Sequence, residues 1–210
     1  MKKPFTLVEL LIAMSVLSVF LLGLMQFYTT TEDVMSAGAN RTEMFERARI
    51  AMDMMANDLT CMYYSQTDKS MSPFECTGTS FEVSTIRPEK LDSSAKTTII
   101  GAQYKWNSGD RKLTYAFDKN KDGVFSVKDA SFGGSETLVE GVTDFSVTAN
   151  TQSGLSIPDS VLIRMELVDG KTLKRLEANA GSEAAILKNA NKREFRRLVV
   201  IDRGQRKIKE

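Results

Sequence analysis

The pattern of apolar and polar positions divides the chain into a long N-terminal helix and a region of short strands. Residues 10–25 are apolar or small, interrupted only by Ser15, Ser18 and Gly23, and the apolar run extends to Tyr28. A helix needs about 20 such residues to cross a bilayer. The first predicted element is therefore a transmembrane helix that ends near Tyr28.

The charges around this run are distributed unevenly. Lys2 and Lys3 precede it, and after Glu9 the next charged residue is Glu32. The positive-inside rule then keeps the N-terminus in the cytoplasm and puts the rest of the chain outside it. A carboxylate toward the membrane interior is costly unless it is paired, so Glu9 is a candidate functional residue. The alternative is a signal anchor in which Glu9 lies at the bilayer interface.

The next segment, residues 29–62, is predicted to continue the helix with an amphipathic pattern. Its apolar residues recur at steps of three and four: Phe45, Ala48, Met52, Met55, Leu59 and Met62. We expect the polar positions to point away from this stripe, namely Arg47, Arg49, Asp53, Asn57 and Asp58. Such a stripe covers a sheet or forms a coiled-coil seam. The strands predicted after it favour the sheet.

A polar segment over residues 63–73 ends the helix, and alternating patterns follow it. They predict strands over residues 81–86, 97–106, 112–117, 138–148 with a break at Gly141, 161–168 and 195–201. Residues 107–110 are turn formers and predict a hairpin, whereas residues 176–192 are interpreted as a short helix or a loop. Local connections without a repeated βαβ pattern favour an antiparallel sheet. The predicted fold class is α+β, with a long N-terminal helix packed on an antiparallel sheet.

The composition of the chain argues against several kinds of binding site and active site. The formal net charge is +1, so no basic field indicates nucleic-acid binding. The chain has no histidine, which excludes a hydrolase built on Ser-His-Asp or Cys-His. Gly133-Gly134-Ser135 lacks the lysine that a phosphate-binding loop needs. We therefore expect a protein that is not an enzyme and that requires no cofactor.

One loop has the spacing of a calcium-binding EF-hand loop. Gly123 stands at its sixth position, where a sharp turn is needed. The oxygen ligands would be the side chains of Asp118, Asn120, Asp122 and Asp129, the Val124 carbonyl and, through water, Ser126. The segments on either side do not have helical patterns, so a polar hairpin turn is the alternative. Calcium, if bound, would be a structural ion.

The chain has two cysteines, Cys61 and Cys76. Outside the cytoplasm, an oxidising compartment favours a disulfide between them. The bridge would close a loop of about 15 residues and contribute roughly 3 kcal/mol in the chain-entropy model. Two free buried thiols are the alternative.

The N-terminal residues Lys2-Lys3-Pro4-Phe5-Thr6-Leu7-Val8-Glu9-Leu10-Leu11-Ile12-Ala13 and the apolar run after them resemble the type IV prepilin N-terminus of pilins and type II secretion pseudopilins. The resemblance implies that prepilin peptidase cleaves between Pro4 and Phe5 and methylates the new Phe5 amine. Pro4 stands where the family usually has glycine. The helix would be retained as the core of a filament, and Glu9 would face the amine of a neighbouring subunit during assembly.

The order of the later parts resembles the J-class minor pseudopilins of type II secretion, the PulJ/GspJ family. The matching segments include Leu138-Val139-Glu140-Gly141-Val142 and the final Arg196-Arg197-Leu198-Val199-Val200. This implies a leader peptide over residues 1–4, a transmembrane helix over 5–28 and an amphipathic helix over 29–62. A periplasmic β-rich pseudopilin domain over 63–202 and a charged tail over 203–210 complete the chain.

The function that the resemblance implies is structural. The chain would be a single-pass protein of a bacterial inner membrane, with its globular domain in the periplasm, that joins the pseudopilus tip and supports protein export. Its partners would be other minor pseudopilins, the major pseudopilin, prepilin peptidase and the inner-membrane secretion platform.

Two alternatives remain open. One is a minor pilin of a type IV or DNA-uptake pilus, and the other is an uncleaved signal-anchor protein that displays a calcium-binding domain. A cleaved secretory signal peptide is disfavoured, because the small residues Ala37-Gly38-Ala39 lie too far beyond the apolar run.

Overall fold

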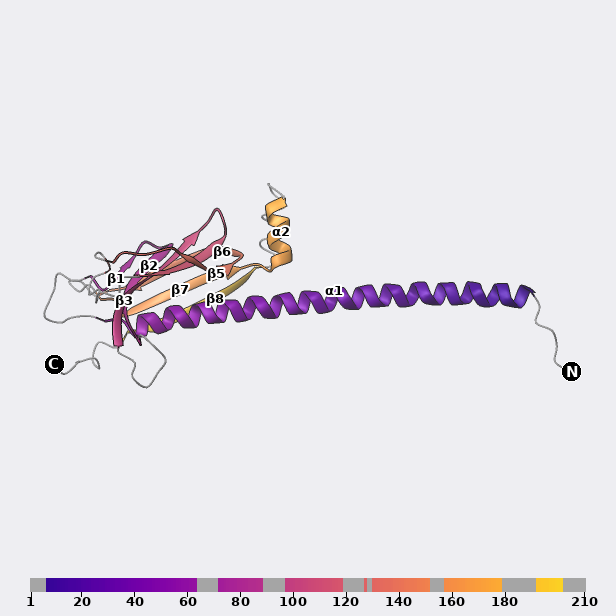
Figure 1. Cartoon of the computed structure of the whole chain (residues 1–210), viewed down its shortest axis with the longest axis horizontal. Helices are drawn as coiled ribbons and strands as arrows, with labels where there is room; N and C mark the ends of the chain where they lie inside the picture. The colour runs from indigo at the N-terminus through magenta and orange to yellow at the C-terminus, as the bar shows by residue number, and fades with distance from the viewer. Residues whose placement is uncertain are drawn as a thin grey trace. The chain divides into compact units, whose positions relative to one another are not determined.

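A computed structural model describes residues 7–63, 72–88, 97–118, 127, 130–151, 157–178 and 192–201. The chain forms two compact units, Met1–Glu43 and Met44–Glu210. Together they contain a long helix, two antiparallel sheets and a short second helix (Figure 1). The fold is thus α+β, as the sequence pattern predicts.

Helix α1 extends over Leu7–Thr60 and contributes residues to both units. No proline falls within these bounds, so the backbone ladder is not interrupted at any position by a missing donor. In the first unit, no residue from Leu7 to Glu43 is buried. The predicted boundary at residue 62 is two residues beyond the end of the helix.

In the second unit, the predicted apolar stripe of α1 faces the protein core. Five of its members are at most 5% exposed: Ala48, Met52, Met55, Leu59 and Met62. They join one core cluster with strand residues such as Phe81 and Phe145, so the choice of a sheet over a coiled-coil seam is confirmed for this segment. Phe45 is 46% exposed and packs edge-on against the ring of Phe195, with the ring centroids 5.5 Å apart.

The larger sheet has five strands in the order β1-β2-β3-β4-β5, all antiparallel. These strands are β1 Phe74–Cys76, β2 Ser80–Pro88, β3 Thr97–Asn107, β4 Lys112–Phe117 and β5 Glu136–Glu140. The period of two is visible at the start of β4, where the buried Leu113 and Tyr115 lie on either side of the less buried Thr114, and Ala116 is buried as well. Strand β1 follows the polar segment and was not predicted, because three residues are too few to display an alternation.

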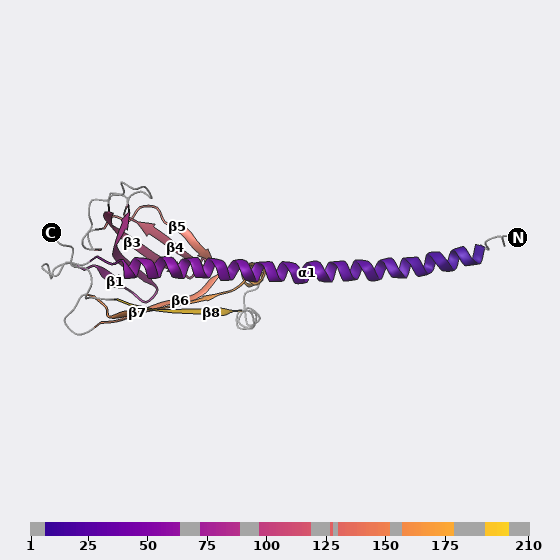
Figure 2. The same ribbon diagram turned by 90° about the horizontal axis from the view of Figure 1, so that it is seen from below.

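The smaller sheet has three antiparallel strands in the order β6-β7-β8 (Figure 2). They are β6 Val142–Asn150, β7 Ser160–Leu167 and β8 Arg193–Val200. Helix α2, Gly170–Ala178, lies between β7 and β8 in the chain. Asp169 caps it, because its Oδ1 accepts the Thr172 N–H at 2.8 Å. The prediction of a helix or loop over residues 176–192 overlaps only the end of α2, and residues 179–191 lie outside the described part.

Gly141 divides what the sequence suggested was one interrupted strand. Its φ of +80° breaks the extended backbone, so β5 ends in the larger sheet and β6 begins in the smaller one. A Cβ at this position would lie 2.8 Å from the Val168 carbonyl oxygen. The single predicted sheet is therefore two sheets. They are joined by the Trp106 indole N–H, which donates to the Val142 carbonyl at 3.1 Å, and by the Val147 N–H, which donates to Gly78 at 2.8 Å.

Candidate functional site

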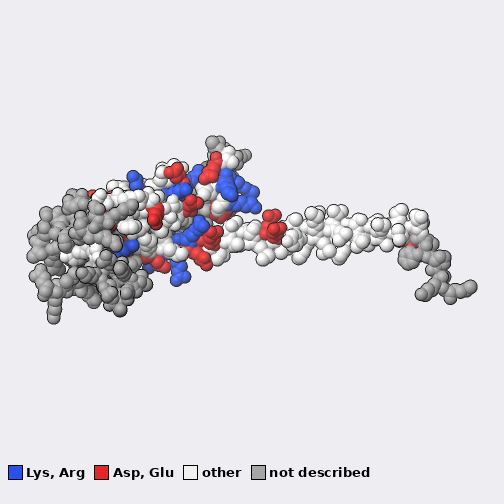
Figure 3. All heavy atoms as spheres, viewed as in Figure 1, with Lys and Arg blue, Asp and Glu red and all other residues white. Residues whose placement is uncertain are grey.

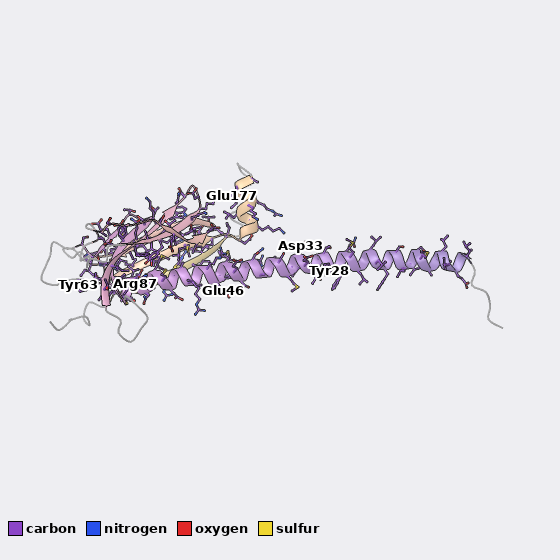
Figure 4. All side chains as sticks on the ribbon, viewed as in Figure 1. Tyr28, Asp33, Glu46, Tyr63, Arg87 and Glu177 are labelled. Carbon is purple, nitrogen blue, oxygen red and sulfur yellow. The ribbon has the colours of Figure 1, made fainter. Side chains whose placement is uncertain are left out.

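The first candidate is the exposed apolar part of α1. α1 is long and apolar enough to cross a membrane, and none of its apolar window is buried within the protein. Figure 4 labels Tyr28 at the end of this run and Asp33 just beyond it. A single apolar N-terminal helix with these properties is compatible with a membrane anchor.

The serine and threonine hydroxyls in and just after this run bond to the helix itself. The Ser15 and Ser18 hydroxyls donate to the carbonyls of Ile12 and Met14, each at 2.8 Å. At the end of the run, Thr30 and Thr31 donate to Gln26 and Phe27, also at 2.8 Å. Each of these four hydroxyl donors thus has an internal acceptor, which lowers the cost of burying it in an apolar environment.

Acidic residues stand at both ends of the apolar run. Glu9 lies in the first turn of α1, where the partial positive charge of the helix N-terminus stabilises a carboxylate. Glu32 and Asp33 follow the run, and no charged residue lies between them and Glu9. Figure 3 shows the stretch between these ends in white. The predicted processing residues Pro4 and Phe5 lie outside the described residues.

The second candidate is a buried polar cluster that joins α1 to the five-stranded sheet. Asp58 of α1 is fully buried, which corrects the prediction that it points away from the apolar stripe. Arg87 of β2 donates from Nη2 to Oδ1 and Oδ2 of Asp58 at 2.6 and 2.5 Å, and from Nε to Asp58 Oδ1 at 3.0 Å. The Tyr104 hydroxyl of β3 donates to Asp58 Oδ2 at 2.6 Å. The carboxylate is therefore buried with charge-assisted partners.

Neighbouring aromatic rings complete this cluster. The Arg87 guanidinium carbon lies 5.4 Å from the centroid of the Tyr115 ring, within the range of a cation–π contact. Burial, and then the Asp58 charge, raise the pKa of Tyr104 well above its usual value. Burial likewise raises the pKa of Tyr115 to about 12, although the Arg87 charge opposes the shift. Both tyrosines are thus neutral over the ordinary pH range.

Arg87 is held in its charged form. Burial alone would lower the pKa of this guanidinium, but the hydrogen bonds and negative charge of Asp58 outweigh it, and the net direction is upward. A buried ion pair of this kind fixes one arrangement of its elements, because breaking it leaves a charge without compensation. The cluster therefore fastens the end of α1 to β2 and β3 in a defined register.

The third candidate is the charged surface of β8. Arg164 of β7 and Arg196 both bind the Glu194 carboxylate, the latter at 2.6 Å. These contacts lower the pKa of Glu194. The hydrogen bond from Arg196 has the largest effect, and burial opposes the shift. On the face of the sheet that meets α1, Arg197 pairs with Asp53. Three basic residues in or next to β8, namely Lys192, Arg196 and Arg197, are therefore engaged in local ion pairs.

The predicted disulfide is wrong for this structure, in which Cys61 and Cys76 are free thiols. Both cysteines lie on the side of β2 that faces away from β3. The Cys61 carbonyl accepts the Ile86 N–H, and Cys76 is the strand partner of Phe81. These two positions of β2 are five residues apart, or about 16 Å at 3.3 Å per residue. A disulfide requires Cα atoms within about 7 Å.

The predicted calcium loop lies mostly outside the described residues, including Asn120, Asp122, Val124 and Asp129. Asp118 is described and is 1% exposed; it bridges to Phe132, and its N–H donates to Gly101 at 2.9 Å. In the described ranges, no group of three or more Cys, Asp or Glu side chains is arranged to hold a metal ion. Calcium binding by this loop remains a prediction.

Comparison with known proteins adds no family. The chain matches no model of a known protein family and no curated protein sequence.

Proposed function

We propose that the chain is a minor pseudopilin of a type II secretion system, a structural subunit that assembles at the pseudopilus tip and supports protein export. The observation that carries the proposal is α1 itself. Its N-terminal part is apolar and exposed, and its C-terminal part covers antiparallel sheets in a separate compact unit. This division of one helix agrees with the architecture that the resemblance to prepilins implies.

The N-terminal part of α1 supports a role in both membrane and filament. Its hydroxyl groups bond within the helix, so the same surface tolerates lipid before assembly and neighbouring apolar helices afterwards. The Glu9 charge then sets the register in which the apolar helices of neighbouring subunits pack. In this proposal it pairs with the methylated amine of Phe5 in a neighbouring subunit.

The C-terminal part of α1 supports a role in transmitting force to the globular unit. A subunit that is pushed through its helix must pass the force to its globular unit. Within that unit, the Asp58–Arg87 pair and the buried methionine stripe connect α1 to the sheets. These contacts bury charge and apolar surface together, so they resist sliding of the helix better than apolar packing alone.

The substitution Glu9→Ala tests the proposal. In cells that lack their own copy, we expect the E9A chain to reach the membrane at a normal level and to fail in copurifying with other pseudopilins and in supporting export. The matched control is Glu32→Ala, which removes a carboxylate beyond the apolar run. Full export by the E9A chain would contradict the proposal and favour a display anchor.

A further inference from the structure

Two sheet edges of the globular unit have opposite charge. β5 ends the five-stranded sheet and β8 ends the three-stranded sheet, so each has a neighbouring strand on one side only among the described strands. β8 contains three arginines and one glutamate, a net charge of +2. β5 contains two glutamates and no cation, a net charge of −2. An unpaired strand edge offers backbone groups to any strand that can approach it.

The β8 edge also exposes apolar surface. In the described strands, three large apolar side chains are exposed: Leu162 at 40%, Leu198 at 62% and Val200 at 69%. Leu162 and Leu198 are direct cross-strand partners, and Val200 lies two residues further along β8. They form one apolar patch beside the free edge. On β5, Leu138 is a half-buried apolar side chain between the two glutamates.

Part of this charge has no local partner. Arg193 at the start of β8 and Glu136 at the start of β5 form no ion pair with another residue in the part of the chain that the structure describes. Glu140 is paired with Lys112 at 2.8 Å, and the Lys112 and Glu140 side chains are 41% and 49% exposed, so this pair can be shared with an incoming arginine at little cost.

The two edges lie on opposite sides of the globular unit. In Figure 2, β5 lies on one side of the Met44–Thr60 part of α1, and β8 lies on the other. Copies that stand side by side in one orientation therefore bring the β8 edge of one to the β5 edge of the next. Such a contact joins different surfaces of identical subunits, so it can continue from copy to copy.

We propose that a second copy of this chain binds the β8 edge through its β5 edge. The basic, apolar edge formed by Arg193–Val200 and Leu162 meets the acidic edge formed by Glu136–Glu140. Opposite charge selects this pairing over β8 with β8 or β5 with β5, which would bring like charges together. The contact uses only the globular unit and does not depend on the role in secretion.

A charge-swap experiment on the full chain in nonionic detergent tests the proposal. One variant carries Arg193→Glu and Arg196→Glu, which changes the net charge of β8 from +2 to −2. The other carries Glu136→Lys and Glu140→Lys, which changes β5 from −2 to +2. All four side chains are exposed or engaged in exposed ion pairs, so we expect both variants to fold. The control is Lys171→Glu with Lys174→Glu, an equal change of charge on the exposed face of α2.

Association is measured by sedimentation velocity at low and high salt. We expect the wild-type chain and the α2 control to self-associate at low salt and to dissociate at high salt. Each edge variant alone should associate at least about tenfold more weakly than the wild-type chain. An equimolar mixture of the two variants should recover the wild-type association. A wild-type chain that is monomeric at every concentration would overturn the proposal. So would self-association that both edge variants retain in full, because the contact would then involve another surface.

Discussion

Arg87 on β2 binds both carboxylate oxygens of Asp58 on α1, and no part of the Asp58 side chain is exposed. These residues are 29 positions apart in the chain and connect its helix to its larger sheet. Removing one member of a buried pair leaves the other charge without compensation and costs about 3–5 kcal/mol, whereas replacing both members with apolar residues costs less.

We therefore predict that Arg87→Met lowers the free energy of unfolding by about 3–5 kcal/mol, and that Asp58→Leu combined with Arg87→Met loses less than the sum of the single changes. Urea unfolding of the full chain, followed by the fluorescence of Trp106, the single tryptophan, measures each variant. Additive effects in this double-mutant cycle would show that the two side chains act independently.

The tyrosines beside this pair predict a loss of stability in alkali. The pKa of Tyr104 is raised and that of Tyr115 is raised to about 12, whereas a tyrosine in the unfolded chain titrates near 10. Below pH 10 both states keep the proton and stability is complete. Above pH 10 the unfolded state loses protons that the folded state keeps, so the free energy of unfolding falls by up to about 1.4 kcal/mol per pH unit for each tyrosine.

Urea midpoints measured between pH 9 and pH 12 check this prediction. The variant that combines Tyr104→Phe and Tyr115→Phe should start at lower stability and show a flatter dependence on pH, because its two groups no longer titrate. If wild type and variant had the same slope above pH 10, these tyrosines would not be the groups responsible.

The turn between the two sheets depends on Gly141. A side chain there would occupy a positive-φ backbone and place its Cβ 2.8 Å from the Val168 carbonyl oxygen. We expect Gly141→Ala to cost about 1–3 kcal/mol of unfolding free energy, measured by thermal or urea unfolding. Gly134→Ala is the matched control, because no atom lies within 4 Å of its added Cβ. Equal stability of the two variants would contradict this reading of the turn.

Much of the fold follows from sequence periodicity. Steps of three and four identify the buried face of α1, and a period of two identifies seven of the eight described strands, with β5 and β6 expected as one interrupted strand. The division into two sheets does not follow. Gly141 marks a break in the sequence pattern, but which strand edges meet on either side of it has no local sequence signal. The cysteines show the same limit: loop length allowed a bridge that strand register forbids.

The buried ion pair left a signal in the sequence that was missed. The period of two in β2 puts Arg87 on the same face as Phe81, Val83 and Thr85, which are all buried. A cation at a core-facing position requires an anion. Asp58 follows Met55 by three residues and precedes Met62 by four, so it borders the buried stripe. Searching core-facing strand positions for charged residues would have found this pair.

Calcium binding by the Asp118 loop remains a prediction with a direct test. If the loop binds the ion, calcium at a hundred times its dissociation constant should raise the free energy of unfolding by about 2.7 kcal/mol, and a chelator should remove the gain. Asn120→Ala with Asp122→Ala should abolish the response, and magnesium at the same concentration is the control. An unchanged unfolding midpoint with calcium would leave the loop as a polar turn.

The intact mass and N-terminal peptide of the chain, extracted from its native membrane, test the proposed function most directly. The proposal predicts a chain that begins at N-methylated Phe5 and retains the apolar helix. A chain that begins at Met1 would contradict it and favour an uncleaved display anchor. A chain that begins near Asn40 would show removal of the helix and exclude any pilin-like assembly.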